Sequence, residues 1–194
     1  VNRLLAESNY HLENYDRAIK YFNLYFSNNN SFAKQEYYML AFSYFKSLDN
    51  VNAIMFFEKS LGQNDTLDQI SSYYLGASYL KMNNKKYSLN AFKKSSQFNI
   101  NPSLKEDALF NYAKLSYELD LPYNNTLEIF KKFINESNSQ PKIDTIQTLM
   151  ANVLRGSSNY LKAYNGLKSL VSHTKEQKII MQELAYFLAI NEFN

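Results

Sequence analysis

The sequence contains no cysteine, which excludes disulfide bonds, thiolate metal sites and a cysteine nucleophile. It also has no tryptophan, and only 4 glycines and 3 prolines in 194 residues. So few backbone breakers argue against an all-β fold and favour long helices joined by short turns. No G-x-G-x-x-G, Walker or G-x-S-x-G pattern occurs, and four glycines are too few to build a phosphate-binding loop.

Charge of one sign and long hydrophobic runs are missing as well. The net charge of +3 comes from 21 basic and 18 acidic residues, so it does not by itself indicate attraction to nucleic acid or to a membrane surface. No apolar stretch approaches the ~20 residues that span a bilayer, so we expect no membrane-spanning helix. Hydrophobic residues make up 45% and charged residues 20%, which is typical of a globular protein.

Residues that carry catalysis are also scarce. His11 and His173 are the only histidines, and neither stands in a zinc-binding H-E-x-x-H spacing. We interpret both as solvated residues near helix ends, and the acidic pair Glu106 and Asp107 as solvated surface. The sequence therefore predicts no enzyme, no metal, no cofactor and no small-molecule substrate.

The strongest pattern present is an internal repeat. Small residues recur at separations of 35, 35, 37, 38 and 34, at Ala6, Ala41, Gly76, Ala113, Ala151 and Ala185. A second small series follows twelve or thirteen residues later, at Ala18, Ala53, Ser88, Thr126 and Ala163. A third series of large apolar residues lies four residues further, at Phe22, Phe57, Phe92, Phe130 and Leu167. Three parallel series with one period indicate a repeated structural unit.

Each period indicates two helices. In the second period we expect helices over about 31–46 and 49–61, because apolar residues recur there at helical spacing. Two helices approach closely only where small side chains face each other, so we predict that the two small series close each helix pair. One pair cannot bury its apolar face alone, and we expect successive pairs to stack through the aromatic series.

Prolines and glycines fit these helix bounds. Pro102 and Pro141 stand where helices are expected to begin, and Pro122 stands in the turn of the fourth pair. Gly62 and Gly156 stand at expected helix ends, where we predict that they supply left-handed caps.

These residues resemble the tetratricopeptide repeat (TPR), a family with a helical-hairpin repeat of about 34 residues. Residues 12–22 (LENYDRAIKYF) are similar to the family's turn and second helix, and residues 74–80 (YLGASYL) to its first helix. The resemblance implies an all-α, right-handed α-solenoid of about five helix-turn-helix repeats plus a terminal helix. We expect one domain over 1–194, with repeats at about 1–30, 31–65, 66–101, 102–140 and 141–174 and a partial repeat at 175–194.

The family small residue late in the second helix is kept in only two repeats. The corresponding positions hold Tyr25, Ser60, Ser95, Phe133 and Leu170. The last two complete repeats are also lengthened by two or three residues, so the resemblance is stronger in repeats one to three.

The resemblance also implies a function, which is to bind a partner protein or peptide in a concave groove lined by the first helices. The groove positions map to Tyr10, Tyr38, Phe42, Phe45, Lys46, Tyr73, Lys81, Phe110, Lys114, Tyr117, Asn152, Arg155 and Tyr186. Some family members clamp a C-terminal carboxylate with lysine and asparagine. That asparagine position holds Glu7, Phe42, Ala77 and Lys114 here, so we expect no such clamp.

The aromatic groove residues allow a second interpretation, in which the rings fill the core between repeats. For Phe42 and Phe45 both interpretations stay open, whereas Tyr73, Phe110 and Tyr186 favour core or partial burial.

Two other functions share this architecture. A pentatricopeptide-like module would bind RNA, but the small-residue series and the nearly balanced charge oppose it. A self-assembly module is the other alternative, because residues 179–190 are apolar around much of the expected last helix.

Residues 104–114 (LKEDALFNYAK) also resemble long multi-repeat proteins of the bacterial cell envelope, which implies a periplasmic or envelope location. The residues themselves do not fix the compartment. Because the chain begins with Val1 inside an expected helix, we expect it to be a fragment of a longer protein.

Overall fold

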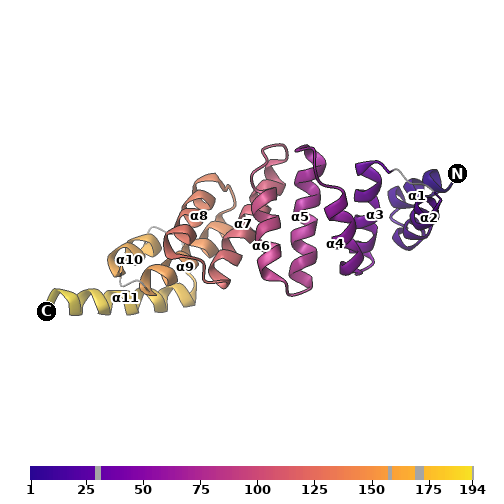
Figure 1. The fold of residues 1–194 in the computed structure, drawn as a ribbon. Helices are drawn as coiled ribbons and strands as arrows, with labels where there is room; N and C mark the ends of the chain where they lie inside the picture. The colour runs from indigo at the N-terminus through magenta and orange to yellow at the C-terminus, as the bar shows by residue number, and fades with distance from the viewer. Residues whose placement is uncertain (29–31, 157–158, 169–172, 194) are drawn as a thin grey trace. The chain divides into compact units, whose positions relative to one another are not determined.

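The computed structural model describes residues 1–28, 32–156, 159–168 and 173–193, and the regular secondary structure in these ranges is entirely α-helical (Figure 1). The helices are α1 (Asn2–His11), α2 (Tyr15–Ser27), α3 (Lys34–Lys46), α4 (Asn50–Lys59), α5 (Thr66–Lys81), α6 (Lys85–Ser95), α7 (Pro102–Glu118), α8 (Tyr123–Glu136), α9 (Gln140–Gly156), α10 (Tyr160–Lys168) and α11 (Lys175–Phe193). The predicted all-α fold of helix pairs is confirmed.

Local capping sets the helix starts. The expected start of α3 near Ser31 lies outside the described residues, and the helix begins at Lys34 because the Glu36 carboxylate accepts a hydrogen bond from the Ala33 N–H (2.7 Å). Asp49 caps α4 by accepting from the Asn52 N–H (3.1 Å). Pro102 opens α7 as expected, after an asparagine whose side chain caps the helix.

In the first four hairpins the turn is closed by a residue with left-handed backbone conformation. These residues are Glu13 (φ 59°), Leu48 (φ 65°), Asn83 (φ 56°) and Asp120 (φ 50°). In each case this residue and the one after it donate backbone hydrogen bonds to the preceding helix, such as Leu48 N–H to Phe45 O and Asp49 N–H to Tyr44 O. This is the Schellman arrangement, formed here without glycine.

The predicted left-handed glycine cap is wrong for Gly156, whereas Gly62 has a positive φ just after α4 but does not close a hairpin turn. Gly156 is the last residue of α9 and has no positive φ, and Gly62 has φ 138° in the loop after α4. Within the first four hairpin turns the left-handed position is held by residues other than glycine.

We expect Leu48→Gly to raise the free energy of unfolding by about 0.5–1 kcal/mol. A β-carbon in the left-handed region costs about 1–2 kcal/mol, and the greater flexibility of unfolded glycine cancels part of the gain. The Leu48 side chain is 72% exposed, so its removal sacrifices little packing. Urea unfolding followed by circular dichroism measures the change. Leu48→Ala keeps the β-carbon and serves as the control; an equal gain in that variant would contradict the backbone explanation.

Contacts between Cα atoms group the chain into two compact units, Val1–Leu109 and Phe110–Asn194. Helix α7 begins in the first unit and ends in the second. The single domain over 1–194 stays a prediction.

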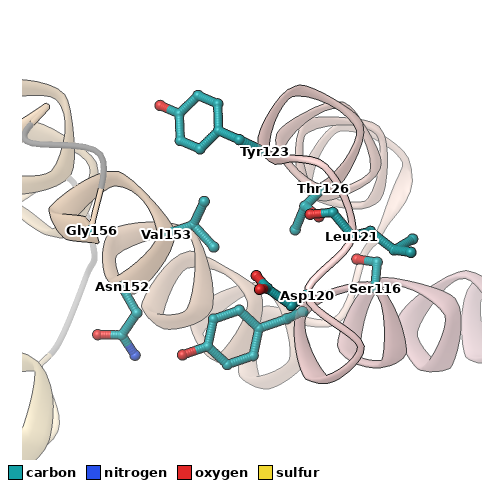
Figure 2. Close-up of a pocket in the computed structure, with 9 residues that line it drawn as sticks. Ser116, Asp120, Leu121, Tyr123, Thr126, Asn152, Val153 and Gly156 are labelled. Carbon is teal, nitrogen blue, oxygen red and sulfur yellow. The ribbon is translucent and has the colours of Figure 1, made fainter.

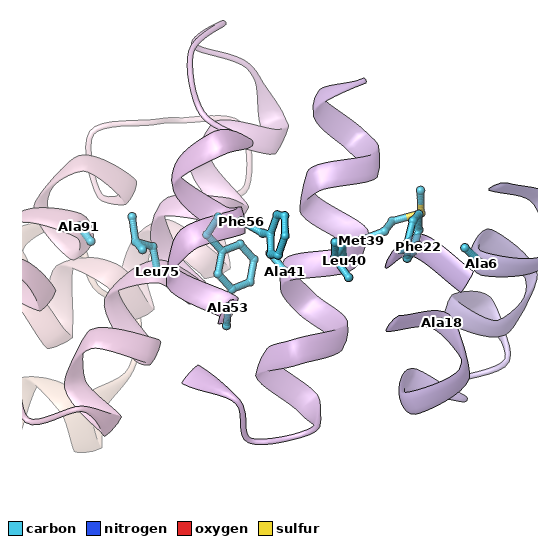
Figure 3. Close-up of a cluster of buried hydrophobic side chains, with 11 residues drawn as sticks. Ala6, Ala18, Phe22, Met39, Leu40, Ala41, Ala53, Phe56, Leu75 and Ala91 are labelled. Atoms are coloured by element: carbon cyan, nitrogen blue, oxygen red, sulfur yellow. The ribbon is translucent and has the colours of Figure 1, made fainter. Parts of the chain in front are cut away.

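In the first unit the small residues lie between helices as predicted. The first-helix residues Ala6 and Ala41 and the second-helix residues Ala18 and Ala53 are completely buried, and Figure 3 shows them within the hydrophobic cluster. Phe22, Phe57 and Phe92 of the aromatic series are also buried. The helices of each pair pack on each other, and α2 and α4 also pack on the next first helix, α3 and α5.

The second unit repeats this pattern with one exception. Ala113, Ala151, Thr126 and Ala163 are buried, together with the large residues Phe130 and Leu167. Ala185 of α11 is exposed, against the expectation for its series. Among the described residues no second helix follows α11, so nothing covers the face on which Ala185 lies.

Candidate functional site

The first unit contains a cluster of aromatic rings on its first helices. The ring of Phe42 lies at the centre, with its centroid 4.9 Å from that of Tyr74 and 6.0 Å from those of Tyr10, Tyr15 and Tyr38. These rings come from α1, α3 and α5, apart from Tyr15 at the start of α2. All five are partly exposed, so the cluster is neither a closed core nor a free surface.

Two exposed lysines lie over these rings. The Lys46 ammonium is 5.6 Å from the centroid of Tyr15 and 5.7 Å from that of Phe42. The Lys81 ammonium is 4.1 Å from the centroid of Phe45, whose ring lies 5.3 Å from that of Tyr74. Within the described ranges neither lysine has a carboxylate partner, so both charges remain available to a ligand. We call this surface the aromatic face: Tyr10, Tyr15, Tyr38, Phe42, Phe45, Tyr74, Lys46 and Lys81.

The phenols of the aromatic face stay uncharged. Burial raises the pKa of Tyr38, and the neighbouring Tyr10 raises it further through charge repulsion and a hydrogen bond. Burial also raises the pKa of Tyr10 and of Tyr74. Because a raised phenol pKa keeps the proton bound at neutral pH, Lys46 and Lys81 provide the only charges of the aromatic face.

The structure brings together most of the residues predicted for the groove in this unit. Tyr10, Tyr38, Phe42, Phe45, Lys46 and Lys81 all belong to the aromatic face. Phe42 and Phe45 pack against neighbouring rings on one side and keep another side exposed, so the core and groove interpretations describe two sides of the same rings.

Tyr73 differs from the other predicted groove residues. Its ring centroid lies 5.5 Å from that of the buried Phe92, and both burial and the nearby Asp107 raise its pKa. Tyr73 touches the aromatic face only through Tyr74, at 5.4 Å. Its partial burial agrees with the core interpretation.

Sequence reasoning missed two residues of the aromatic face, Tyr15 and Tyr74. The groove prediction considered only the first helix of each pair, and it omitted Tyr15 because this residue is the first of α2. Tyr74 precedes the Leu75-Gly76 pair that marks the core, although its ring joins Phe42 to Phe45. An aromatic residue directly before a large-small pair is the signal that could have identified Tyr74.

In the second unit the predicted groove residues do not form one surface. Phe110 packs its ring 5.5 Å from that of the buried Phe133, and Lys114 and Lys142 lie 5.6 and 5.9 Å from its centroid. Phe110 therefore contributes mainly to packing against α8. Tyr186 is 65% exposed, so the expected core or partial burial is wrong for this residue; its ring lies 5.9 Å from that of Phe187.

Tyr117 and Asn152 line one cleft of about 490 Å³ between α9 and the turn that joins α7 to α8. Figure 2 shows Val153 on the α9 side of this cleft and Asp120 and Thr126 on the other side. The remaining lining residues are Ser116, Leu121, Tyr123 and Gly156.

Asn152 also borders a second depression, of about 480 Å³, together with Arg155 of α9 and Lys175, Glu176, Ile179 and Ile180 around the start of α11. Arg155 forms an ion pair with Glu183. The structure thus groups Tyr117 with Asn152, and Asn152 with Arg155.

The described residues also bear on two other kinds of site, a metal site and a membrane-spanning helix. No group of three or more histidine, aspartate or glutamate side chains is placed to hold a metal ion there. No helix in those ranges has the length and apolar character needed to cross a membrane.

Comparison with known proteins rests on structure. No family model matches the sequence, and a search of curated proteins gives no significant match. YrrB, described as a TPR protein with an unusual peptide-binding site, is 17% identical; the match covers 96% of this chain and 88% of YrrB, with a TM-score of 0.65. MamA is 13% identical, with 98% of each chain covered and a TM-score of 0.60.

A putative kinesin light chain from Podosopora anserina with TPR-like repeats is 12% identical, with 94% of each chain covered and a TM-score of 0.55. At these identities the likeness establishes the fold. The chain has the fold of the tetratricopeptide-repeat proteins, as its recurring small residues predict.

Proposed function

We propose that the chain is a protein-interaction scaffold and that its aromatic face binds a peptide segment of a partner. The observation that carries this proposal is the row of partly exposed rings from α1, α3 and α5 with Lys46 and Lys81 over them. Aromatic side chains bury large areas and have few rotatable bonds to restrict, which is why they dominate binding energy at interfaces.

The charges and hydrogen-bonding groups of the face define the partner. Lys46 and Lys81 have no carboxylate partner among the described residues and favour a segment with acidic side chains. The neutral phenols of Tyr10 and Tyr38 can exchange hydrogen bonds with its backbone. The asparagine position of the family's carboxylate clamp is held here by Glu7, Phe42 and Ala77 in the first unit. The partner segment therefore binds through internal acidic and apolar residues rather than through a C-terminal carboxylate. The peptide-binding site reported for YrrB supports a peptide ligand for this fold.

We expect Lys46→Glu/Lys81→Glu to weaken peptide binding at least tenfold, because it places two carboxylates against an acidic segment. Twelve-residue peptides would be selected on the intact chain by phage display, and the affinity of the best acidic peptide measured by calorimetry. Both lysines are exposed, so the double variant keeps its helicity.

Lys86→Glu/Lys93→Glu is the matched control, since it makes the same charge change at exposed positions of α6 in the same unit. Its affinity for the peptide should fall by less than about threefold, through long-range charge alone. Equal losses in the two double variants would refute a specific role for the aromatic face.

Self-association through residues 179–190 is a second candidate function. It is favoured by the exposed apolar side chains on α11, among them Ile179, Tyr186 and Ile190. Light scattering over a concentration series separates it from peptide binding, because a chain that stays monomeric has no such interface.

A further inference from the structure

The second unit contains a half-enclosed cavity of about 420 Å³ among α8, α9 and α10. Its lining residues are Lys131, Ile134, Asn135, Gln147, Met150, Ala151, Leu154, Lys162, Ala163 and Gly166. The volume falls within the roughly 300–1,000 Å³ of small-molecule sites in proteins. None of these lining residues belongs to the residues predicted for the groove.

The repeat explains why the cavity exists. Ala151 and Ala163 follow Ala41 and Ala53 by the same distance, since 151 − 41 and 163 − 53 both equal 110. By this spacing Gly166 stands where the second repeat has Phe56. Glycine therefore replaces a large ring at a position that faces the neighbouring hairpin.

The surroundings of Phe56 correspond to the lining of the cavity. The Phe56 ring lies 5.7 Å from that of Tyr44 and 6.4 Å from that of Tyr37, which the spacing of 110 matches to Leu154 and Gln147. It also lies 6.1 Å from Phe26, which matches Ile134 at the spacing of 108 between Ala18 and Thr126. Four aromatic residues fill this space between the first two hairpins, whereas smaller residues leave it open here.

Gly166 itself confirms the open space. A β-carbon built on Gly166 meets no atom of the described residues within 4 Å beyond its chain neighbours and its own helix backbone. Glycine inside a helix costs roughly 0.5–1 kcal/mol relative to alanine. Packing therefore does not require glycine here, and the room is available to a ligand.

The polar groups around the cavity indicate what such a ligand carries. Both charged lining residues, Lys131 and Lys162, are cations, and no ion pair of either one occurs in the parts of the chain that the structure describes. The Gln147 Oε1 atom is buried and has no hydrogen-bond partner among the described residues. After a half-turn about its last torsion, the same amide offers its NH₂ group to an anion. Ile134, Met150 and Leu154 add apolar side chains to the lining.

We propose that this cavity binds a small carboxylic acid with a ring or short aliphatic body. The apolar body occupies the space that the Phe56 ring fills in the second repeat, the carboxylate is held by Lys131 and Lys162, and Gln147 forms a hydrogen bond with the ligand.

The test uses 2-naphthoate as the probe and 2-naphthamide as its neutral counterpart of the same shape, both titrated into the intact chain by calorimetry. We expect one molecule of 2-naphthoate to bind, at least fivefold more tightly than the amide. The double variant Lys131→Gln/Lys162→Gln should bind 2-naphthoate and 2-naphthamide with about equal affinity. Absence of naphthoate binding, or an undiminished preference in the double variant, would overturn the proposal.

A second variant fills the cavity. Gly166→Leu should weaken naphthoate binding at least tenfold while leaving the melting temperature unchanged or higher, because the new side chain enters open space. Ala189→Leu, which adds the same bulk at an exposed position of α11, should keep the affinity of the original chain. Undiminished binding by Gly166→Leu would place the probe elsewhere and exclude this cavity.

Discussion

Asp68→Ala is expected to lower the free energy of unfolding of the first unit by about 3 kcal/mol. The Asp68 carboxylate is completely buried and accepts a hydrogen bond from the Lys34 ammonium at 2.6 Å. It also accepts three backbone hydrogen bonds, from the N–H groups of Gly62 (3.0 Å), Gln63 (3.0 Å) and Asn64 (2.6 Å). Removal of the carboxylate therefore leaves three backbone donors without the acceptor that joins α5 to the preceding loop, and leaves Lys34 of α3 with Asp65 alone.

Asp65→Ala is the matched comparison, because Asp65 binds the same Lys34 ammonium at 2.7 Å. The Asp65 side chain is 42% exposed, and it caps α5 by accepting from the Asp68 N–H. Loss of this cap and of an exposed ion pair should cost about 1 kcal/mol. Urea unfolding followed by circular dichroism measures both variants. Equal losses of unfolding free energy in the two variants would show that the buried Asp68 carboxylate contributes no more stability than the exposed Asp65 carboxylate.

The same network gives a pH dependence. Burial alone raises the pKa of Asp68, but hydrogen bonds from Lys34 and from the Asn64 and Gly62 N–H groups outweigh burial, and the pKa in the folded state is lowered. A lowered carboxyl pKa stabilises the fold above the unfolded value of about 3.9, and this contribution is lost as the pH falls through the folded value. The stability difference between the original chain and Asp68→Asn should be constant near pH 7 and shrink below about pH 4.

The sequence predicted the hairpins because their packing depends on side-chain size at fixed spacing. Ala41 and Phe57 are completely buried, and their places in the recurring small and large series predict this burial from the sequence alone. The turn conformations were not predictable in the same way. Leu48 adopts φ 65° because the Schellman hydrogen bonds and the packing of α3 on α4 impose it, against the preference of leucine itself.

The candidate sites were predicted in part. Phe42 and Lys46 were identified because first-helix positions are periodic, whereas Tyr74 was missed because its ring reaches across to α3 from a position next to the core. The cavity beside Gly166 was missed for another reason. The recurring series mark the smallest and the most buried residues. Gly166 stands one residue before Leu167 and belongs to none of these series, so the missing ring leaves them unchanged.

Gly76→Leu is expected to destabilise the first unit by about 3 kcal/mol, at the upper end of the cost of overpacking. A β-carbon on Gly76 would lie 3.0 Å from the Cγ and Cδ1 atoms of Phe92, whose ring is almost completely buried. The Gly76 carbonyl also accepts a hydrogen bond from the buried Ser88 hydroxyl at 2.8 Å, which fixes the distance between α5 and α6. The two helices therefore cannot separate to admit a side chain without breaking this bond.

Gly76→Ala separates this clash from the usual effect of glycine in a helix. Alanine normally stabilises a helix interior by roughly 0.5–1 kcal/mol, and Gly166→Ala should show that gain because its β-carbon enters open space. Gly76→Ala should instead lower the midpoint of urea unfolding, since its β-carbon presses on the Phe92 ring. If both alanine variants gained stability equally, Phe92 would have room to move, and close approach of the helices at Gly76 would not be what holds this hairpin together.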